Sequence, residues 1–238
     1  MSSRPAAGGG RWVDVDPVRV ARWIDGFTAR HGPPGTIVTG YGLLLTAPDG
    51  ATAELHRPPG TPPATDLPGF LAEATTARRL GLLLARKGAV AVGVADGTEL
   101  VTSKVDSRYV QGRTAAGGWS QQRFARRRDN QAKAAMADAV ELALRLLLPA
   151  VGGLDAVVAG GDRRAIDTIL ADRRLAPLAA LRADRLLDVP EPRHAVLVDA
   201  ITAARAVRVL VRDPEPSAPE PHHLEPSAPE PRAPDGVG

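Results

Sequence analysis

The residues best suited to chemistry lie in one stretch, from Gly112 to Lys133. Two adjacent glycines, Gly117 and Gly118, precede two adjacent glutamines, Gln121 and Gln122. Glycine lets a backbone approach a partner closely. A carboxamide is no strong base, but it can orient a water molecule and hydrogen-bond a developing oxyanion. Four arginines follow within residues 123–128. A glycine loop that presents carboxamides on a cationic base suits a target made of phosphate and acyl ester, such as an acylated RNA.

The polar and cationic side chains around these glutamines are candidates for RNA contact. On a helix the arginines cannot all face one way, so about half of them are expected to bind phosphate and the rest to be solvated. Trp119, at the predicted tip of the loop, is expected to stack on a nucleotide or to dock the loop. The predicted RNA-binding set is Arg113, Trp119, Ser120, Arg123, Arg126, Arg127, Arg128 and Lys133.

Composition limits the function classes. The chain has 238 residues, a formal net charge of +3 and a pI of about 9.8. Because aromatic residues make up only 3%, Ala, Val and Leu must build the core. There is no cysteine, which excludes disulfides, thiolate metal sites and a cysteine nucleophile. No apolar run reaches the length of a membrane span, and the N-terminus lacks the apolar core of a signal peptide. A cytoplasmic protein is the expectation.

A small N-terminal unit is predicted from residue 11 to 57, after a disordered leader over 1–10. Asp16-Pro17 is typical of a helix start, and the glycines and prolines of 32–35 end that helix. Residues 36–47 and 51–56 are predicted as strands that meet at a turn. The Pro- and Gly-rich segment 58–68 is expected to be a linker.

A larger domain is predicted over 69–212. Its expected order is a helix over 69–87, a hairpin at Asp96-Gly97, a short strand over 108–111 and a long helix from Ser120 to about Leu148. After Pro149 come strands over 154–160, 186–189 and 206–212, with helices over 162–173 and 192–204. This order predicts an α/β fold, with a mixed β-sheet flanked by helices. Residues 213–238 contain the repeat Glu-Pro-Ser-Ala-Pro-Glu-Pro and are predicted to be a disordered tail.

A family resemblance adds to this interpretation. Gly112-Arg113, Gly117-Gly118 and Arg123-Phe124-Ala125-Arg126 resemble the middle domain of the eukaryotic and archaeal class of peptide-chain release factors, in which a Gly-Gly-Gln tip precedes a long helix. Here Trp119 follows the two glycines, and glutamine comes later. This departure resembles the release-factor-like peptidyl-tRNA hydrolases of ribosome-associated quality control, and most closely their actinobacterial group. The resemblance is sharp over 112–133, weaker over 88–212, and absent from the first 57 residues and the tail.

The resemblance implies a ribonuclease-H-like sheet and hydrolysis of peptidyl-tRNA at the peptidyl transferase centre of the large ribosomal subunit. The implied partners are that subunit, its 23S rRNA and peptidyl-tRNA, for a monomeric protein without metal or organic cofactor. Gln121 is the first choice for the catalytic carboxamide and Gln122 the second, with Gly117 and Gly118 shaping the loop.

Two other functions stay open at this point. A non-enzymatic rRNA-binding rescue adaptor would keep the basic helix without needing the glutamines. A nuclease that cuts tRNA would need paired carboxylates on the sheet, and no convincing pair is visible among Asp96, Asp106, Asp155, Asp162 and Asp167.

Overall fold

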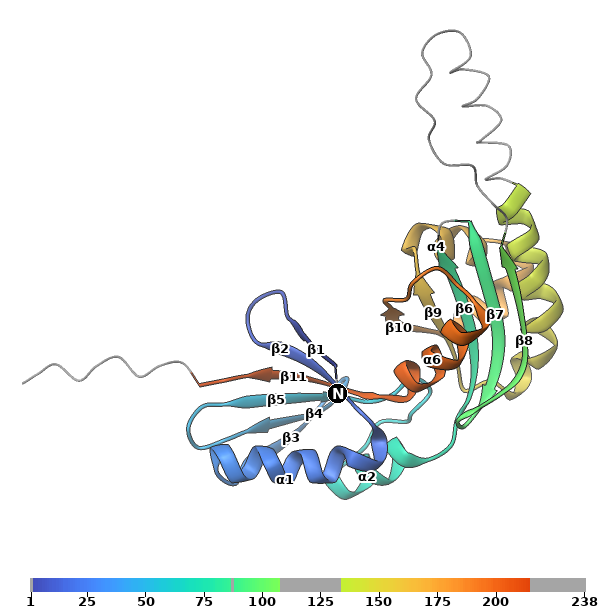
Figure 1. Ribbon diagram of the computed structural model, residues 1–238. Coiled ribbons are helices and arrows are strands. Elements are labelled where there is room, and N and C mark those ends of the chain that lie inside the picture. Colours follow the sequence, from blue (N-terminus) through green and yellow to red (C-terminus); the bar gives the residue numbers. More distant parts are fainter. Residues whose placement is uncertain (1, 87, 108–133, 215–238) are drawn as a thin grey trace, which may run out of the picture.

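The computed structural model describes residues 2–86, 88–107 and 134–214, which form two β-sheets with helices packed on them (Figure 1). The first sheet has six strands in the order β1-β2-β11-β5-β4-β3, all pairs being antiparallel. Its strands are β1 (Ser2–Pro5), β2 (Arg11–Val15), β3 (Gly35–Thr39), β4 (Gly42–Thr46), β5 (Thr52–His56) and β11 (Val207–Arg212). Helices α1 (Val20–His31) and α2 (Leu67–Thr75) lie on one face of it (Figure 1).

Local sequence signals account for the helices of this unit. The Asp16 carboxylate accepts a hydrogen bond from Val18 N and starts a 3-10 turn over Pro17–Arg19, which continues into α1. Gly32, at φ +87°, ends α1. The helix predicted to start at Asp16-Pro17 is confirmed.

The strands of the first sheet alternate between two environments. On β11, Val207, Val209 and Val211 are buried together with the inner residues of α1 and α2. The residues between them, such as Arg208, point to the opposite face, because successive side chains of a strand alternate. No helix of the described part of the chain covers this opposite face in Figure 1, and we call it the open face of the first sheet.

The second sheet has five strands in the order β10-β9-β6-β7-β8. Strands β6 (Arg79–Arg86), β7 (Ala89–Asp96) and β8 (Glu99–Ser107) are antiparallel neighbours, whereas β9 (Ala156–Gly161) and β10 (Arg182–Leu187) run parallel to β6. The Asp96-Gly97 turn joins β7 to β8, with Gly97 at φ +56°. This is the mixed sheet that the sequence predicts.

Helices cover both faces of the second sheet. Residues 134–146 are helical and pack on one face together with α4 (Arg163–Leu170) and α5 (Ala176–Ala180). Helix α6 (His194–Arg205) packs on the other face. The 3-10 turns Leu148–Gly153 and Arg173–Leu175 complete the connections. The predicted α/β class with flanking helices is therefore confirmed.

One element was predicted with the wrong type. The predicted helix over 69–87 is in fact α2 followed by strand β6. On β6, Leu83 and Ala85 are buried in the core on one face, and Leu82 and Leu84 in the core on the other. A strand buried on both faces gives a continuous apolar run, which periodicity alone cannot distinguish from a buried helix.

The predicted domain boundaries also differ from the sheets. The strand predicted over 206–212 exists as β11, but it lies between β2 and β5 of the first sheet. Helix α2 belongs to the same unit, through Phe70 and Ala74. Within the predicted disordered leader, residues 2–5 pair with β2 as β1. The range 69–212 is thus divided between the two sheets, because β11 completes the core of the first.

Several predictions concern other parts of the chain. The short strand predicted over 108–111 and most of the tail predicted over 213–238 lie outside the described residues. Among the described residues, no helix combines the length and apolar character needed to cross a membrane.

Candidate functional site

The predicted chemical residues all lie in one segment outside the described residues, from 108 to 133. They are Arg113, Gly117, Gly118, Trp119, Ser120, Gln121, Gln122, Arg123, Arg126, Arg127, Arg128 and Lys133. What the structure describes are the elements that flank this segment: strand β8, which ends at Ser107, and the helix described over 134–146.

Both flanking elements reach the same edge of the second sheet. Because β6, β8, β9 and β10 all run in one direction, their carboxyl ends share an edge, formed by Arg86, Ser107, Gly161 and Leu187. The other end of the long helix is fixed near the opposite edge, since Leu147 lies against Gly81 at the start of β6. The helix therefore points its 134 end towards the edge where β8 ends (Figure 1).

Hydrogen bonds hold this edge together. Asp162 N donates to the carbonyl oxygen of Ala85 at 2.7 Å, while the Asp162 carboxylate caps α4 by accepting from Arg164 N at 2.9 Å. Arg86 donates to the carbonyl oxygen of Val189 at 2.5 Å and contacts Asp188. The carboxyl end of β6 is therefore tied to the turns that follow β9 and β10.

Four of the five acidic residues considered for a nuclease have structural positions, Asp106 being the exception. Asp155 accepts a hydrogen bond from Arg79 N at 2.7 Å, and Asp167 pairs with Arg182 at 2.6 Å. Asp96 closes the β7–β8 hairpin and Asp162 caps a helix. Within residues 2–86, 88–107 and 134–214, no three His, Asp or Glu side chains come together as a metal-binding group would require.

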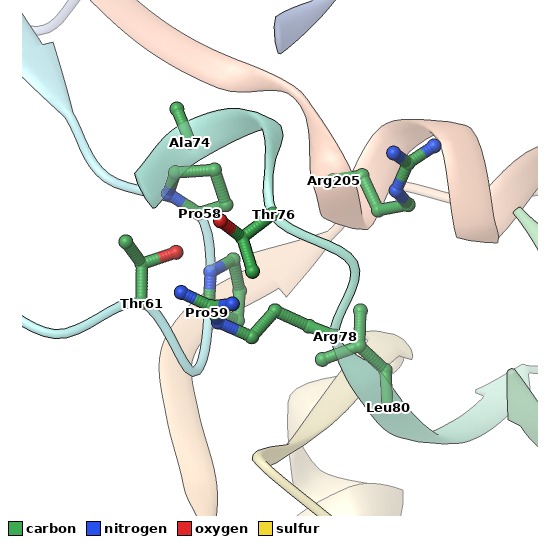
Figure 2. Close-up of a pocket in the computed structure, with 8 residues that line it drawn as sticks. All are labelled: Pro58, Pro59, Thr61, Ala74, Thr76, Arg78, Leu80 and Arg205. Carbon is green, nitrogen blue, oxygen red and sulfur yellow. The ribbon is translucent and has the colours of Figure 1, made fainter. Parts of the chain in front are cut away.

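A small pocket lies where the chain passes from the first unit to the second (Figure 2). Arg78 crosses it and donates from Nε to the carbonyl oxygen of Gly60 at 3.3 Å, while its other end pairs with Glu73. Gly60 in turn packs against Asp155. The pocket has a volume of about 10 Å³, room for no more than one water molecule. These residues form a packed joint between the units rather than a ligand site.

A much larger cavity of about 340 Å³ opens beside this joint, between the open face of the first sheet and strand β10. We call it the junction cavity. The residues of its wall that matter below are Tyr41, His56, Arg57, Thr61, Arg185 and Arg208. None of them was identified as functional from the sequence, because they come from distant parts of the chain.

Aromatic rings form the floor beside this cavity. Tyr41 stacks on His56, with ring centroids 4.8 Å apart and planes 5° from parallel. Trp12 meets His56 edge-on at 5.0 Å, and the Arg208 guanidinium lies 4.0 Å from the centre of the Trp12 ring. Trp23 packs against Phe27 in the core of the first sheet, whereas Trp12 belongs to the open face.

The pH dependence of folding should reveal the burial of His56. Its pKa lies below the usual range, first because burial penalises the charged ring and further because Arg208 and Arg185 are near, although Glu54 opposes this shift. The unfolded chain therefore binds more protons below about pH 6.5, and stability falls as the pH drops through that value. We expect the free energy of unfolding in urea to fall less between pH 7.5 and pH 5.5 in His56→Gln than in the unmodified protein. His194→Gln, at an exposed position, is the matched control. Its free energy of unfolding should fall between the two pH values by as much as that of the unmodified protein.

Comparison with known proteins gave the following similarities. A family model described as the actinobacteria/chloroflexi VLRF1 release factor matches residues 78–210. The crystal structure of an archaeal translation termination factor, aRF1, is 18% identical with a TM-score of 0.43, over 67% of this chain and 48% of that chain. Another structure, described only as an archaeal protein, is 18% identical with a TM-score of 0.37, over 66% and 48%. The chain thus spans about half the length of both. Curated proteins gave no match.

Proposed function

Because the chain belongs to the actinobacterial and chloroflexi VLRF1 release-factor family, we propose that it is a peptidyl-tRNA hydrolase that releases nascent chains from stalled complexes. The proposed place of action is the peptidyl transferase centre of the large ribosomal subunit, in the cytoplasm. The observation that carries the proposal is that the family match over 78–210 contains the whole glycine, glutamine and arginine segment. The platform formed by the ends of β6, β8 and β9 supports it, because a rigid base can aim a loop.

The reaction is the hydrolysis of an ester. Water adds to the carbonyl carbon of the ester, the bond to the ribose oxygen breaks, and the ribose oxygen takes a proton. Gln121 orients the water and hydrogen-bonds the developing oxyanion or the leaving ribose, so catalysis consists mainly of positioning. Gln122 is the second candidate for this role. Gly117 and Gly118 allow the loop to enter a narrow, RNA-lined space.

The cationic residues of the segment hold the surrounding RNA in this proposal. Arg113, Lys133 and about half of the arginines among Arg123, Arg126, Arg127 and Arg128 neutralise phosphates of 23S rRNA or tRNA, and the remaining arginines are solvated. Trp119 contacts a nucleotide at the tip. The protein acts as a monomer on the subunit, and the reaction calls for neither a metal ion nor an organic cofactor.

Large subunits that carry peptidyl-tRNA labelled on both the peptide and the tRNA test the proposal. We expect free peptide together with tRNA of full length. Shortened tRNA would instead identify a nuclease, and tight binding without any cleavage would identify an adaptor. Either of these results would contradict the proposed hydrolase activity.

A further inference from the structure

The junction cavity concentrates positive charge that the described residues do not neutralise. Arg208 lines the cavity. The Nε atom of Arg208 is buried and has no hydrogen-bond partner among the described residues. Among the residues that the structure describes, Arg57 donates to a backbone oxygen, that of Gly40, at 3.1 Å, and to no carboxylate. Of the arginines lining the cavity, Arg185 is paired with a carboxylate, that of Asp14 at 2.8 Å. A further carboxylate at the wall, Asp184, is exposed.

The arginines in and around the cavity repel one another. Burial lowers the pKa of the Arg185 guanidinium, and repulsion from Arg208 and Arg4 lowers it further, against the attraction of Asp14. Burial lowers the pKa of Arg208 as well, and repulsion from Arg4 lowers it further, again against the attraction of Asp14. A folded protein that keeps mutually repelling cations around a cavity is stabilised when an anion enters, because the anion relieves the repulsion.

Two neutral groups complete the cavity. Thr61 is only 7% exposed, and its hydroxyl has no hydrogen-bond partner among the described residues. A buried hydroxyl without a partner is costly, and this one could donate to an anion. Tyr41 is 52% exposed and rests on His56 by stacking. An exposed, supported aromatic ring beside cationic side chains is typical of surfaces that stack nucleic-acid bases.

We propose that the junction cavity binds a backbone phosphate of single-stranded RNA, with an adjacent base stacked on Tyr41. Arg208 and Arg57 hold the phosphate oxygens by charge-assisted hydrogen bonds, and the Thr61 hydroxyl adds a neutral donor. The choice of RNA over other phosphate compounds rests on the proposed function, since a ribosomal substrate surrounds the protein with RNA. The cavity lies outside the predicted catalytic segment, so it would serve to orient the protein on its substrate.

Trp12 offers a local probe of this cavity. In a Trp23→Phe, Trp119→Phe background, Trp12 is the remaining tryptophan, and it contacts Arg208 directly. Titration with an unstructured RNA oligonucleotide should change its fluorescence. In this background Arg208→Gln and Arg57→Gln should each weaken RNA binding by roughly tenfold, the effect of one charge-assisted hydrogen bond. Each should also lower the salt slope of the affinity by about 0.7, the value for one phosphate on a single strand.

Arg22→Gln is the matched control, because Arg22 is exposed on α1, which covers the other face of the first sheet. It should leave affinity and salt slope unchanged, and urea unfolding checks that the variants fold. Equal RNA affinities in all three variants, or a Trp12 signal from inorganic phosphate but not from RNA, would overturn the proposal.

Failure of this inference can be distinguished from failure of the proposed function. Gln121→Ala should keep the Trp12 response, whereas Arg208→Gln should raise the KM for ribosomal complexes and leave kcat nearly unchanged. Cleavage of peptidyl-tRNA without any change of Trp12 fluorescence on adding RNA would refute only the proposed cavity site. A change of Trp12 fluorescence without cleavage would refute only the proposed hydrolase activity.

Discussion

Gln121→Ala should reduce the rate of peptidyl-tRNA cleavage on large subunits by about 100-fold or more while leaving the fold intact. The loss should be this large because the side chain acts only by positioning water and stabilising developing charge, and removing one such preorganised donor typically costs that much in kcat. The effect should appear in kcat rather than KM, because binding to the subunit would come from the arginines. Single-turnover release of labelled peptide, at saturating protein, measures it directly.

Gln131→Ala is the matched control. Gln131 lies in the same segment and is changed in the same way, but it was not assigned a role in the chemistry. It should cleave at the rate of the unmodified protein. Full activity in Gln121→Ala together with loss in Gln122→Ala would transfer the role to the second glutamine. Full activity in both variants would refute the carboxamide mechanism.

The parts of the fold that were predictable depend on local signals. Asp96-Gly97 can form the tight turn of a hairpin, and β7 and β8 pair on either side of it. Asp16-Pro17 and Asp162 start helices because their carboxylates satisfy free backbone N–H groups. Such signals involve residues that are adjacent in sequence, so the sequence contains everything needed to interpret them.

The errors arose where distant residues decide the structure. Residues 80–85 of β6 are apolar throughout because helices cover both faces of their sheet, and only that context distinguishes the strand from a helix. The strand predicted over 206–212 was correct in type, but its neighbours β2 and β5 lie far away in sequence. Nothing local specifies which sheet a terminal strand joins.

The two candidate sites show the same contrast. The segment 112–133 is a contiguous motif, so it could be identified from the sequence alone, although it lies outside the described residues. The junction cavity could not, because Tyr41, His56, Arg185 and Arg208 come together only when β11 lies beside β5 and β10 faces them. The one local hint is alternation: His56 and Arg208 each follow an inward-facing apolar residue on their strands.

Gly161→Ala should destabilise the platform below the predicted loop by about 3 kcal/mol. Gly161 ends β9 at φ +92°, a conformation that side chains with a Cβ atom rarely adopt. A Cβ atom here would lie 2.3 Å from the carbonyl oxygen of Ala85. That oxygen accepts the hydrogen bond from Asp162 N, so relieving the clash would disturb the junction of β6, β9 and α4. Urea unfolding measures the loss, as a lower midpoint at unchanged slope.

Gly152→Ala provides the matched comparison, because no heavy atom beyond its chain neighbours lies within 4 Å of a Cβ atom placed there, among the described residues, and its φ is not in the left-handed region. Its free energy of unfolding should stay within about 0.5 kcal/mol of the unmodified protein. Because β8 ends at the same edge as β9, Gly161→Ala should also lower peptide release at temperatures where the variant is still folded. Equal stability of the two variants would show that the β9–α4 turn can relax around a side chain, and the rigid platform assigned to the loop would have to be abandoned.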